Sequence, residues 1–231
     1  MRPLAIAHRG DPVACRENTL AAFAAAVRAG ADMVEIDVRR TADGAVAVLH
    51  DPTLERLWGS PLALAEATLA EVRALGVDDC RIPELADVLA AVAAPLMVDF
   101  EETDVVEPAL QAIREAGALE RVLFSGGNVE GHRLVRALEP RARIALTWAR
   151  GERPSERLLD ELAVELLNPH RELVEPALVA EMHARGTGVS VWTVDEPGEM
   201  ARLIDVGVDA VITNRIGALV GLLEPVEAAG C

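Results

Sequence analysis

Two rhythms of apolar and polar residues follow one another along most of the chain. Short apolar runs, typical of buried strands, precede segments in which apolar residues recur at three- and four-residue spacing, typical of amphipathic helices. The pattern predicts strands at 4–8, 33–38, 45–49, 96–101, 121–125, 142–148, 164–168, 188–193 and 208–213. It predicts helices at 20–29, from 84 to about 93, and at 104–116, 129–138, 155–162, 175–185, 197–205 and 215–223.

Strands that alternate with helices indicate a parallel sheet. If the strands at 33–38 and 45–49 are counted separately and residues 68–93 supply the next helices, the chain has about eight strand–helix units, the number in a TIM barrel. The expected fold class is therefore α/β, a (β/α)8 barrel. A doubly wound open sheet is the alternative, but the Gly-rich phosphate loop that such a sheet usually carries after its first strand is absent. No repeat or linker interrupts the chain, so we expect one domain over residues 1–231, with residues 53–83 its least regular part.

The strand from Met33 to Val38 carries the first chemical signal. Side chains alternate between the two faces of a strand, so Glu35 and Asp37 point to the same side. Two carboxylates on one buried face repel each other and lose their hydration, which is costly unless a cation or a shared proton compensates. An exposed edge strand is the alternative, but the apolar residues around both acids argue against it.

Polar side chains also follow most of the other predicted strands. In a barrel the carboxyl ends of all strands meet at one rim, which is where barrel enzymes hold their active sites. The residues expected at this rim are His8, Arg9, Glu35, Asp37, His50, Asp51, Asp99, Glu101, Ser125, Trp148, Asn168, His170, Trp192 and Asn214.

These residue types favour phosphoryl chemistry. Carboxylate oxygens are the ligands that Mg²⁺ and Ca²⁺ prefer, and Glu35, Asp37 and Asp99 could supply three, whereas zinc is less suited to a site of acids without Cys. His8 and His50 suit general acid–base catalysis near neutral pH. An arginine such as Arg9 can pair with a phosphate in bidentate fashion. The same set is also compatible with metal-assisted hydrolysis of another bond.

Each residue also has an ordinary structural interpretation. A single His after a strand is more often a packing or capping residue, and Arg9 could simply pair with Glu17. Asp51 before Pro52 suits a turn. Other residues with an ordinary interpretation are Glu101 and Glu102 as solvated charges, Trp192 as core, and His132 and His183 as surface residues of helices, whereas His170 could line the pocket.

Composition excludes several classes of partner. The chain of 231 residues has a formal net charge of −16 and contains no Lys, so nucleic acids and anionic membranes would repel it. No apolar run is long enough to span a bilayer, and the first residues lack a signal-peptide pattern, so we expect a cytoplasmic protein that is a monomer or homodimer. The three cysteines, Cys15, Cys80 and Cys231, have no metal-type spacing and suggest reduced thiols.

At this point the sequence resembles the glycerophosphodiester phosphodiesterase family. The resemblance is carried by seven motifs that occur in the family's order over almost the whole chain. They are His8-Arg9-Gly10, Glu17-Asn18-Thr19, Glu35-Ile36-Asp37, His50-Asp51-Pro52-Thr53-Leu54, Ile82-Pro83-Glu84-Leu85, Val191-Trp192-Thr193-Val194 and Gly207-Val208-Asp209-Ala210-Val211-Ile212-Thr213-Asn214.

The resemblance implies a TIM barrel with a divalent cation, Mg²⁺ or Ca²⁺, that hydrolyses small glycerophosphodiesters to glycerol 3-phosphate and an alcohol. Carried over by position, Glu35 and Asp37 are metal ligands, His8 and His50 are the acid–base pair, and Arg9 holds the phosphate. The stretch from about 52 to 83 then corresponds to the family's small insertion after the second main strand, which caps the pocket.

One motif departs from the family pattern. The family usually has Glu-x-Lys at the end of the third main strand, and here the residues are Asp99-Phe100-Glu101. Asp99 is the expected third metal ligand, although its side chain is one methylene shorter. Glu101 replaces a cation with an anion, which could weaken phosphate binding or add a metal ligand. A smaller change is Asn214, where the family commonly has Asp.

Two further functions remain open. One is a lysophospholipase D-like diesterase acting on a lipid, which would need an apolar groove at the mouth, for example around Leu57 and Trp58. The other is a catalytically weak relative that binds a phosphoester or a metal. In each case we place Trp192 and Glu101 beside the substrate.

Overall fold

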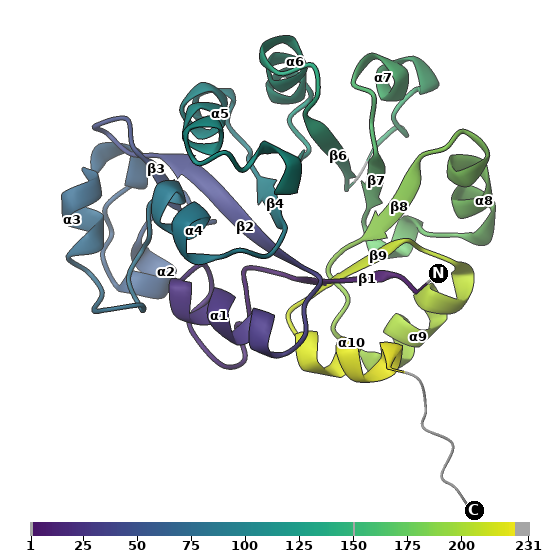
Figure 1. Cartoon of the computed structure of the whole chain (residues 1–231), viewed down its shortest axis with the longest axis horizontal. Coiled ribbons are helices and arrows are strands. Elements are labelled where there is room, and N and C mark those ends of the chain that lie inside the picture. Colours follow the sequence, from purple (N-terminus) through teal and green to yellow (C-terminus); the bar gives the residue numbers. More distant parts are fainter. Residues whose placement is uncertain (1, 150, 225–231) are drawn as a thin grey trace, which may run out of the picture.

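A closed parallel barrel forms the centre of the molecule in the computed structural model, which describes residues 2–149 and 151–224. The order β1-β9-β8-β7-β6-β5-β4-β2 is closed by pairing of β1 with β2, and every pair in it is parallel (Figure 1). The eight barrel strands are β1 (Leu4–Ala7), β2 (Met33–Arg40), β4 (Leu96–Asp99), β5 (Val122–Gly126), β6 (Arg143–Trp148), β7 (Leu166–Pro169), β8 (Gly188–Val191) and β9 (Ala210–Thr213). The predicted fold class is confirmed.

One strand was assigned wrongly in the count of eight. β3 (Val46–Val48) pairs antiparallel with β2, with Val38 opposite Val48, and lies outside the closed barrel. The connection from β2 to β3 is a short turn through Gly44, which has a φ of 86°. Such a turn can join only antiparallel neighbours, because a parallel neighbour needs a crossover of a dozen or more residues. The other eight of the nine predicted strands form the barrel.

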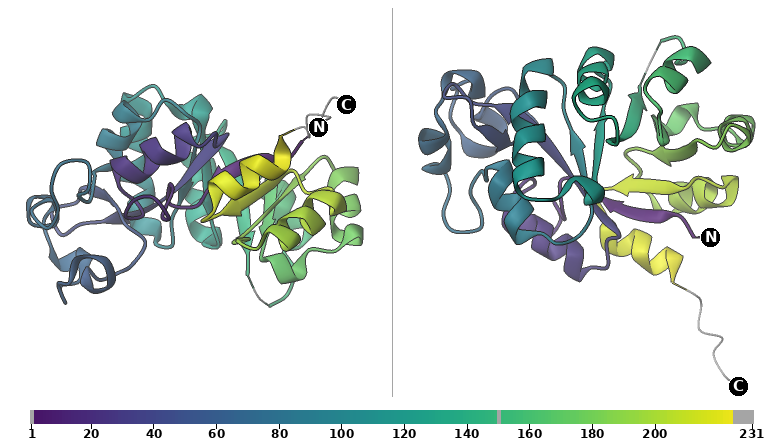
Figure 2. Two further views of the ribbon diagram at one scale, coloured as in Figure 1. Left: turned by 90° about the horizontal axis from the view of Figure 1, so that it is seen from below. Right: turned by 45° about the horizontal axis from the view of Figure 1, so that its top comes forward.

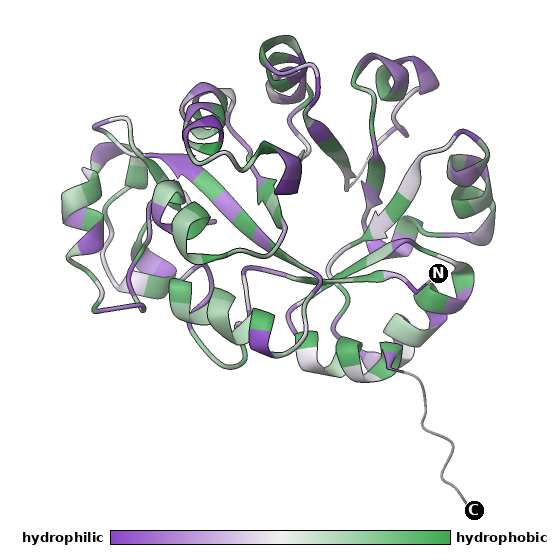
Figure 3. Cartoon of the chain, in the orientation of Figure 1, coloured by the Kyte–Doolittle hydropathy of each residue, from purple (hydrophilic) through white to green (hydrophobic). Residues whose placement is uncertain are grey.

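Helices surround the barrel as an outer ring, apart from a group beside β3 (Figures 1 and 2). Polar and apolar residues are interspersed along most of these helices (Figure 3), and buried apolar residues such as Leu110 and Val135 belong to the core beside the strands. The helices are α1 (Leu20–Arg28), α2 (Glu55–Trp58), α3 (Leu69–Arg73), α4 (Leu85–Ala91), α5 (Val106–Glu115), α6 (Val129–Leu138), α7 (Glu156–Glu161), α8 (Pro176–Ala184), α9 (Pro197–Val206) and α10 (Ile216–Leu223). In the described part of the chain, no helix has both the length and the apolar character needed to cross a bilayer.

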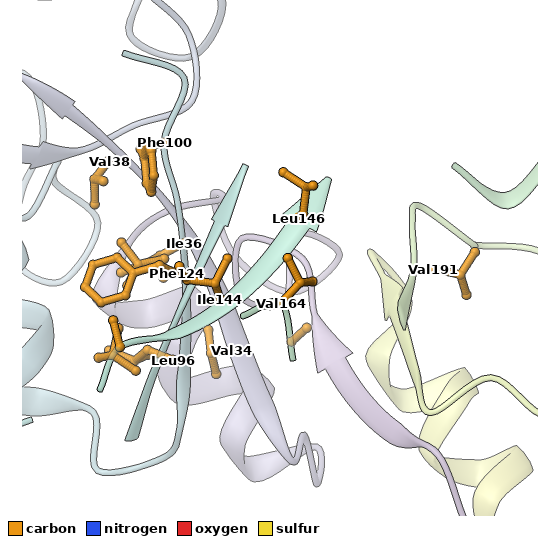
Figure 4. Packing of buried hydrophobic residues seen from close by; sticks show 14 of the residues in the cluster. Val34, Ile36, Val38, Leu96, Phe100, Phe124, Ile144, Leu146, Val164 and Val191 are labelled. Atoms are coloured by element: carbon orange, nitrogen blue, oxygen red, sulfur yellow. The ribbon is translucent and has the colours of Figure 1, made fainter. Parts of the chain in front are cut away.

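The outward faces of the strands form the larger core. Val34, Ile36 and Val38 of β2 alternate with the acids of that strand and pack towards the helices (Figure 4). They are at most 1% exposed. Burying each such side chain contributes about 1.5–3 kcal/mol, so the alternation of β2 fixes which of its faces is turned inward.

The inward faces of the strands are layered. Side chains near the amino ends form a compact apolar plug, whose members are Ile6, Met33, Met97, Leu123, Ala145, Leu166, Ala210 and Ile212. One or two positions further along the strands the inward side chains become polar. The plug therefore closes the barrel below the site and forms its floor.

The segment between β3 and α4 builds a small core of its own. Leu54, Leu64 and Ile82 are at most 1% exposed and pack together beneath α2 and α3. A capping box begins α3. The Thr68 side chain accepts from the backbone N–H of Glu71, and the Glu71 side chain accepts from the backbone N–H of Thr68. The predicted irregular stretch thus consists of short helices held by a local core.

Candidate active site

A cavity of about 480 Å³ opens at the carboxyl ends of the barrel strands. It is lined by His8, Arg9, Glu35, Asp37, His50, Met97, Asp99, Glu101, Ser125, Gly127, Asn128, Thr147, Ala149, Asn168, Trp192 and Ile212. The structure thus brings together all eight residues to which the sequence assigns a role in chemistry or binding. Asp51, Trp148, His170 and Asn214, also expected at the rim, are not among the lining residues.

The turn after β1 is shaped by two residues with positive φ. Arg9 has a φ of 58°, which is unfavourable for a residue with a Cβ, and in this conformation its backbone N–H donates to Glu35 Oε2 at 2.8 Å. Gly10 follows with a φ of 84°, and a Cβ there would lie 2.7 Å from the backbone of Ala22 in α1. The motif His8-Arg9-Gly10 therefore requires glycine at its third position so that the first two can face the cavity.

Three carboxylates occupy neighbouring inward positions on two paired strands. Glu35 and Asp37 lie two residues apart on β2, and Asp99 of β4 is in register with Asp37. Glu35 and Asp37 are 5% and 7% exposed. Burial, followed by the charges of Asp37 and Asp99, raises the pKa of Glu35 well above its usual range. Burial and the charge of Asp37 likewise raise the pKa of Asp99 to about 7.

Arg9 partly offsets this negative charge. Its Nε lies 3.2 Å from Asp37 Oδ2, and its Nη1 donates to Glu17 Oε1 at 2.9 Å, so the ordinary pairing with Glu17 does occur. Asn18, with a φ of 55°, donates from Nδ2 to Asp37 Oδ2 at 2.7 Å. Thr19 caps α1, and its side chain accepts from the Ala22 N–H. One guanidinium and one amide therefore face three acids.

The donor set suits a hard divalent cation, because three buried acids share one end of a cavity and the raised pKa values of Glu35 and Asp99 show that negative charge there is poorly compensated. Residues 2–149 and 151–224 contain no group of three His, Cys, Asp or Glu side chains already placed to hold a metal ion. Glu35 and Asp37 are engaged with Arg9 and Asn18 instead. The residues fit such a cation in chemistry and burial.

His8 is oriented by an amide. Its Nδ1 lies 2.8 Å from Asn214 Oδ1, while Asn214 Nδ2 donates to Asp195 Oδ2 at 2.8 Å. The bond to Asp195 fixes which end of the Asn214 amide faces His8, so His8 Nδ1 must carry the proton and Nε2 is left for the cavity. Burial and the nearby Arg9 charge lower the pKa of His8. His8 is therefore a neutral imidazole with a free lone pair.

His50 is oriented by a carboxylate. β2 extends past the rim, and β3 returns alongside it, so the end of β3 places His50 at the level of Asp37, whose carbonyl accepts from the Leu49 N–H. His50 Nδ1 lies 2.7 Å from Asp51 Oδ1. A hydrogen bond from Arg56 lowers the pKa of Asp51 to about 2. Because an ionised carboxylate can only accept a hydrogen bond, His50 Nδ1 carries a proton that it donates to Asp51.

Glu101 lines the cavity, but its charge is already paired. Glu101 Oε2 accepts from Arg39 Nη2 at 2.7 Å, and the same guanidinium donates to Glu102 and to the backbone carbonyl of His50. Arg39 is 8% exposed and lies on the inward face of β2, two residues beyond Asp37. Sequence reasoning missed Arg39, Arg56 and Asp195, although Arg39 continues the alternation of Glu35 and Asp37.

Several weaker expectations also have an outcome. His132 was interpreted as a surface residue, which is wrong, because it is fully buried on α6 and its Nε2 bonds to the Gly126 carbonyl at 3.0 Å. His183 pairs at the surface with Asp209. His170 contacts the Trp192 ring edge-on, with 5.4 Å between the ring centroids. Leu57 and Trp58 pack against the core of their own segment. The thiols of Cys15 and Cys80 are free, and Cys231 lies outside the described residues.

Comparison with known proteins decides the family. The model of the glycerophosphoryl diester phosphodiesterase family matches residues 8–218. The chain belongs to this family. A glycerophosphodiester phosphodiesterase of Caldanaerobacter subterraneus is 32% identical over 240 residues, which cover 97% of this chain and 99% of the relative. A probable glycerophosphodiester phosphodiesterase 2 of Mycobacterium tuberculosis is 32% identical over 94% of this chain and 89% of the relative.

Solved structures of similar fold include other members of this group. A phosphodiesterase of Oleispira antarctica, solved in complex with the product sn-glycerol-3-phosphate, has a TM-score of 0.88 at 23% identity and covers 95% of this chain and 96% of its own. A putative glycerophosphoryl diester phosphodiesterase of Silicibacter pomeroyi has a TM-score of 0.87 at 24% identity, with 96% and 93% covered. At this identity the likeness supports the barrel fold, and the family and enzyme class predicted from the sequence are confirmed by the family match and the closer relatives.

Proposed function

We propose that this phosphodiesterase hydrolyses glycerophosphodiesters to glycerol 3-phosphate and an alcohol, with His8 as general base, His50 as general acid and a divalent cation on Glu35, Asp37 and Asp99. The observation that carries the proposal is the different anchoring of the two histidines in one cavity. His8 has an amide partner and a lowered pKa, whereas His50 has a carboxylate partner. Such environments separate an acid from a base.

In the first step His8 acts on the nucleophile, either water or a hydroxyl of the glycerol moiety. The nucleophile's oxygen forms a bond to phosphorus and its proton passes to His8 Nε2, because Nδ1 is occupied by Asn214. The negative charge that builds on the phosphate oxygens faces the Arg9 guanidinium, which lines the same cavity.

In the second half of the reaction His50 acts on the leaving group. The bond between phosphorus and the alcohol oxygen breaks, and that oxygen takes the proton from His50 Nε2. The hydrogen bond from His50 Nδ1 to Asp51 holds the ring in place for this transfer. A divalent cation, when bound, supplies further stabilisation of phosphate charge, and Mg²⁺ and Ca²⁺ both suit the oxygen ligands.

With water as nucleophile the reaction gives glycerol 3-phosphate directly. With a glycerol hydroxyl it gives a cyclic phosphate, which water then opens to glycerol 3-phosphate, with His50 taking the proton of the water and His8 returning its proton to the glycerol oxygen.

The two other functions gain no support from a particular contact. Leu57 and Trp58 are partly buried against the core of the 53–83 segment, and neither lines the cavity. Glu101 is paired with Arg39, so the anion at this position does not by itself oppose phosphate binding. The substrate we propose is a small diester, and the cytoplasmic location and the monomeric or dimeric state stay predictions.

The test is a direct assay. Glycerol 3-phosphate release from glycerophosphodiesters with different alcohols is measured with Mg²⁺, with Ca²⁺ and with a chelator. We expect release with at least one cation and strong loss with the chelator. Absence of release from every diester with both cations would reject the proposed reaction, and full activity in the chelator would reject the cation.

A further inference from the structure

Arg56 lies at the centre of a chain of charges that joins two parts of the site. Its Nη2 donates to Glu17 Oε1 at 2.7 Å and to Asp51 Oδ1 at 3.0 Å, and its Nη1 and Nε donate to the other oxygen of each carboxylate. Glu17 in turn accepts from Arg9, and Asp51 bonds to His50. We propose that Arg56 is a positioning residue that holds the proton-donating His50 and the phosphate-binding Arg9 in one arrangement.

The two carboxylates need this guanidinium. The side chains of Glu17 and Asp51 are only 14% and 17% exposed, so water compensates little of their charge. Although burial raises the pKa of Glu17, the hydrogen bonds from Arg56 and Arg9 lower it to about 2. Both carboxylates are therefore ionised and oriented by Arg56. Without Arg56, Glu17 would change its hydrogen bond to Arg9, and Asp51 would change its hydrogen bond to His50.

Arg56 is well placed for this role because its own backbone is fixed. It lies on the single turn of α2, between Leu54, which is 1% exposed, and Trp58, whose N–H donates to the Leu54 carbonyl at 3.0 Å. Trp58 also lies under the Arg16 guanidinium, 4.4 Å from its ring centroid. The segment at 53–83 thus acts on the site through one side chain, since its residues do not appear in the cavity lining.

The inference rests on the proposed roles of His50 and Arg9, and it predicts separate effects on kcat and on KM. Replacement of Arg56 by Gln should lower kcat through His50 and raise KM through Arg9, with kcat/KM falling about 10²-fold, the size expected when catalytic groups are misplaced by about 1 Å. Asp51→Asn should act mainly on kcat and Glu17→Gln mainly on KM. Arg56→Gln combined with Asp51→Asn should lower kcat no further than the worse single change, because both act through one chain.

Arg133 provides a matched control. Like Arg56 it is about half exposed and binds two carboxylates, Glu130 and Glu161, but it lies on the outer helix α6. Arg133→Gln should leave kcat and KM unchanged. Because the side chain of Arg56 is 47% exposed, dilute guanidinium ion should partly restore kcat in Arg56→Ala and do nothing for Arg133→Gln.

A measurement without turnover separates this inference from the proposed reaction. The imidazole ¹⁵N signals of His50 should shift in Arg56→Gln, and those of His183, which pairs with Asp209 at the outer surface, should not. Unchanged His50 signals, or kinetic losses no greater than those of Arg133→Gln, overturn the positioning role. An inactive wild type rejects the reaction instead, and the NMR comparison still decides the role of Arg56. Arg56→Lys, which keeps one charge, serves if the Gln variant unfolds.

Discussion

Acidic side chains are paired differently at the two ends of the barrel. At the amino end, Arg2 binds both oxygens of Asp32 at 2.7 Å, and Arg143 binds both oxygens of Glu165 at 2.6 and 2.9 Å. Both of these acids have an arginine of their own, and the Arg143 pair is substantially exposed. At the carboxyl end, the buried acids outnumber the cations that reach them. These two pairs at the amino end are neutral within the protein, whereas the carboxyl end holds an excess of negative charge.

This difference predicts a separation of stability from activity. Exposed ion pairs contribute about 0–1 kcal/mol each to the free energy of unfolding, so the loss of one should change stability only slightly. Buried acids with raised pKa values oppose folding, so the carboxyl end retains them at a cost to stability, as binding sites often do. Changes at one end should therefore affect folding slightly, and changes at the other should affect catalysis strongly.

The largest effect is expected from the two histidines. His8→Ala and His50→Ala should each lower kcat by about 10²–10⁴-fold, the usual contribution of an acid or base. Their thermal unfolding should stay near that of the wild type, because both side chains line a cavity. Steady-state kinetics and circular dichroism of both variants test this, and a variant that keeps the wild-type kcat would remove that histidine from the mechanism.

A pH effect of similar energy is expected beside the site at His132. Burial lowers the pKa of His132 to about 4, whereas an unfolded chain has a His pKa of about 6.5. The unfolded state therefore gains a proton first, and the free energy of unfolding should fall by up to about 3 kcal/mol as pH decreases from 6.5 to 4. Urea unfolding across this range measures the slope.

A matched variant isolates the contribution of this side chain. His132→Gln keeps an amide for the Gly126 carbonyl and should remove that part of the slope while lowering stability at neutral pH through altered packing against Phe100. If the wild type and His132→Gln lose stability equally between pH 6.5 and 4, the acid sensitivity arises elsewhere.

A smaller and opposite change in stability is expected from the acids. Glu35→Gln removes a buried charge yet keeps an oxygen for the Arg9 N–H, so the free energy of unfolding should rise by about 1 kcal/mol without added metal. Activity should fall at the same time. Wild type should gain about 2.7 kcal/mol at a cation concentration of 100 Kd, and the variant should gain less. A variant that is both less stable and still stabilised by metal would contradict the comparison.

The smallest effect is expected at the amino end. Arg143→Ala removes an ion pair whose side chains are 36% and 42% exposed, so we expect a loss of at most about 1 kcal/mol and no change in kcat or KM. Chemical unfolding and the diester assay measure both. A tenfold loss of kcat in this variant would show that the two ends are coupled.

Much of this arrangement could be read from the order of residues. Alternation on β2 and β4 was sufficient to predict that Glu35, Asp37 and Asp99 face one cavity, because every second side chain of a strand points to the same face of the sheet. The strand elements were placed within a few residues of their bounds. The error over β3 came from counting strands without weighing the short turn before it, and a turn of that length already indicates an antiparallel pair.

The burial of His132 and the long-range polar pairs could not be predicted, because they depend on contacts that strand alternation and helix periodicity do not encode. His132 lies on a helix whose inward face is set by its docking on β5, which spacing alone left undecided. The partners of Asp51 and Asn214 are Arg56 and Asp195, and with 22 basic and 38 acidic side chains in the chain, no rule of spacing selects such pairs. Long-range polar networks require the backbone to be placed first.

The return of the chain along β3 has a consequence for how this enzyme could diversify. Because His50 lies on a hairpin that takes no part in barrel closure, residues 41–84 carry the proposed proton donor, its acidic neighbour Asp51 and Arg56 in one continuous segment. A chimera that exchanges this segment between relatives would change His50 together with its hydrogen-bond partners and would leave the eight barrel strands unchanged.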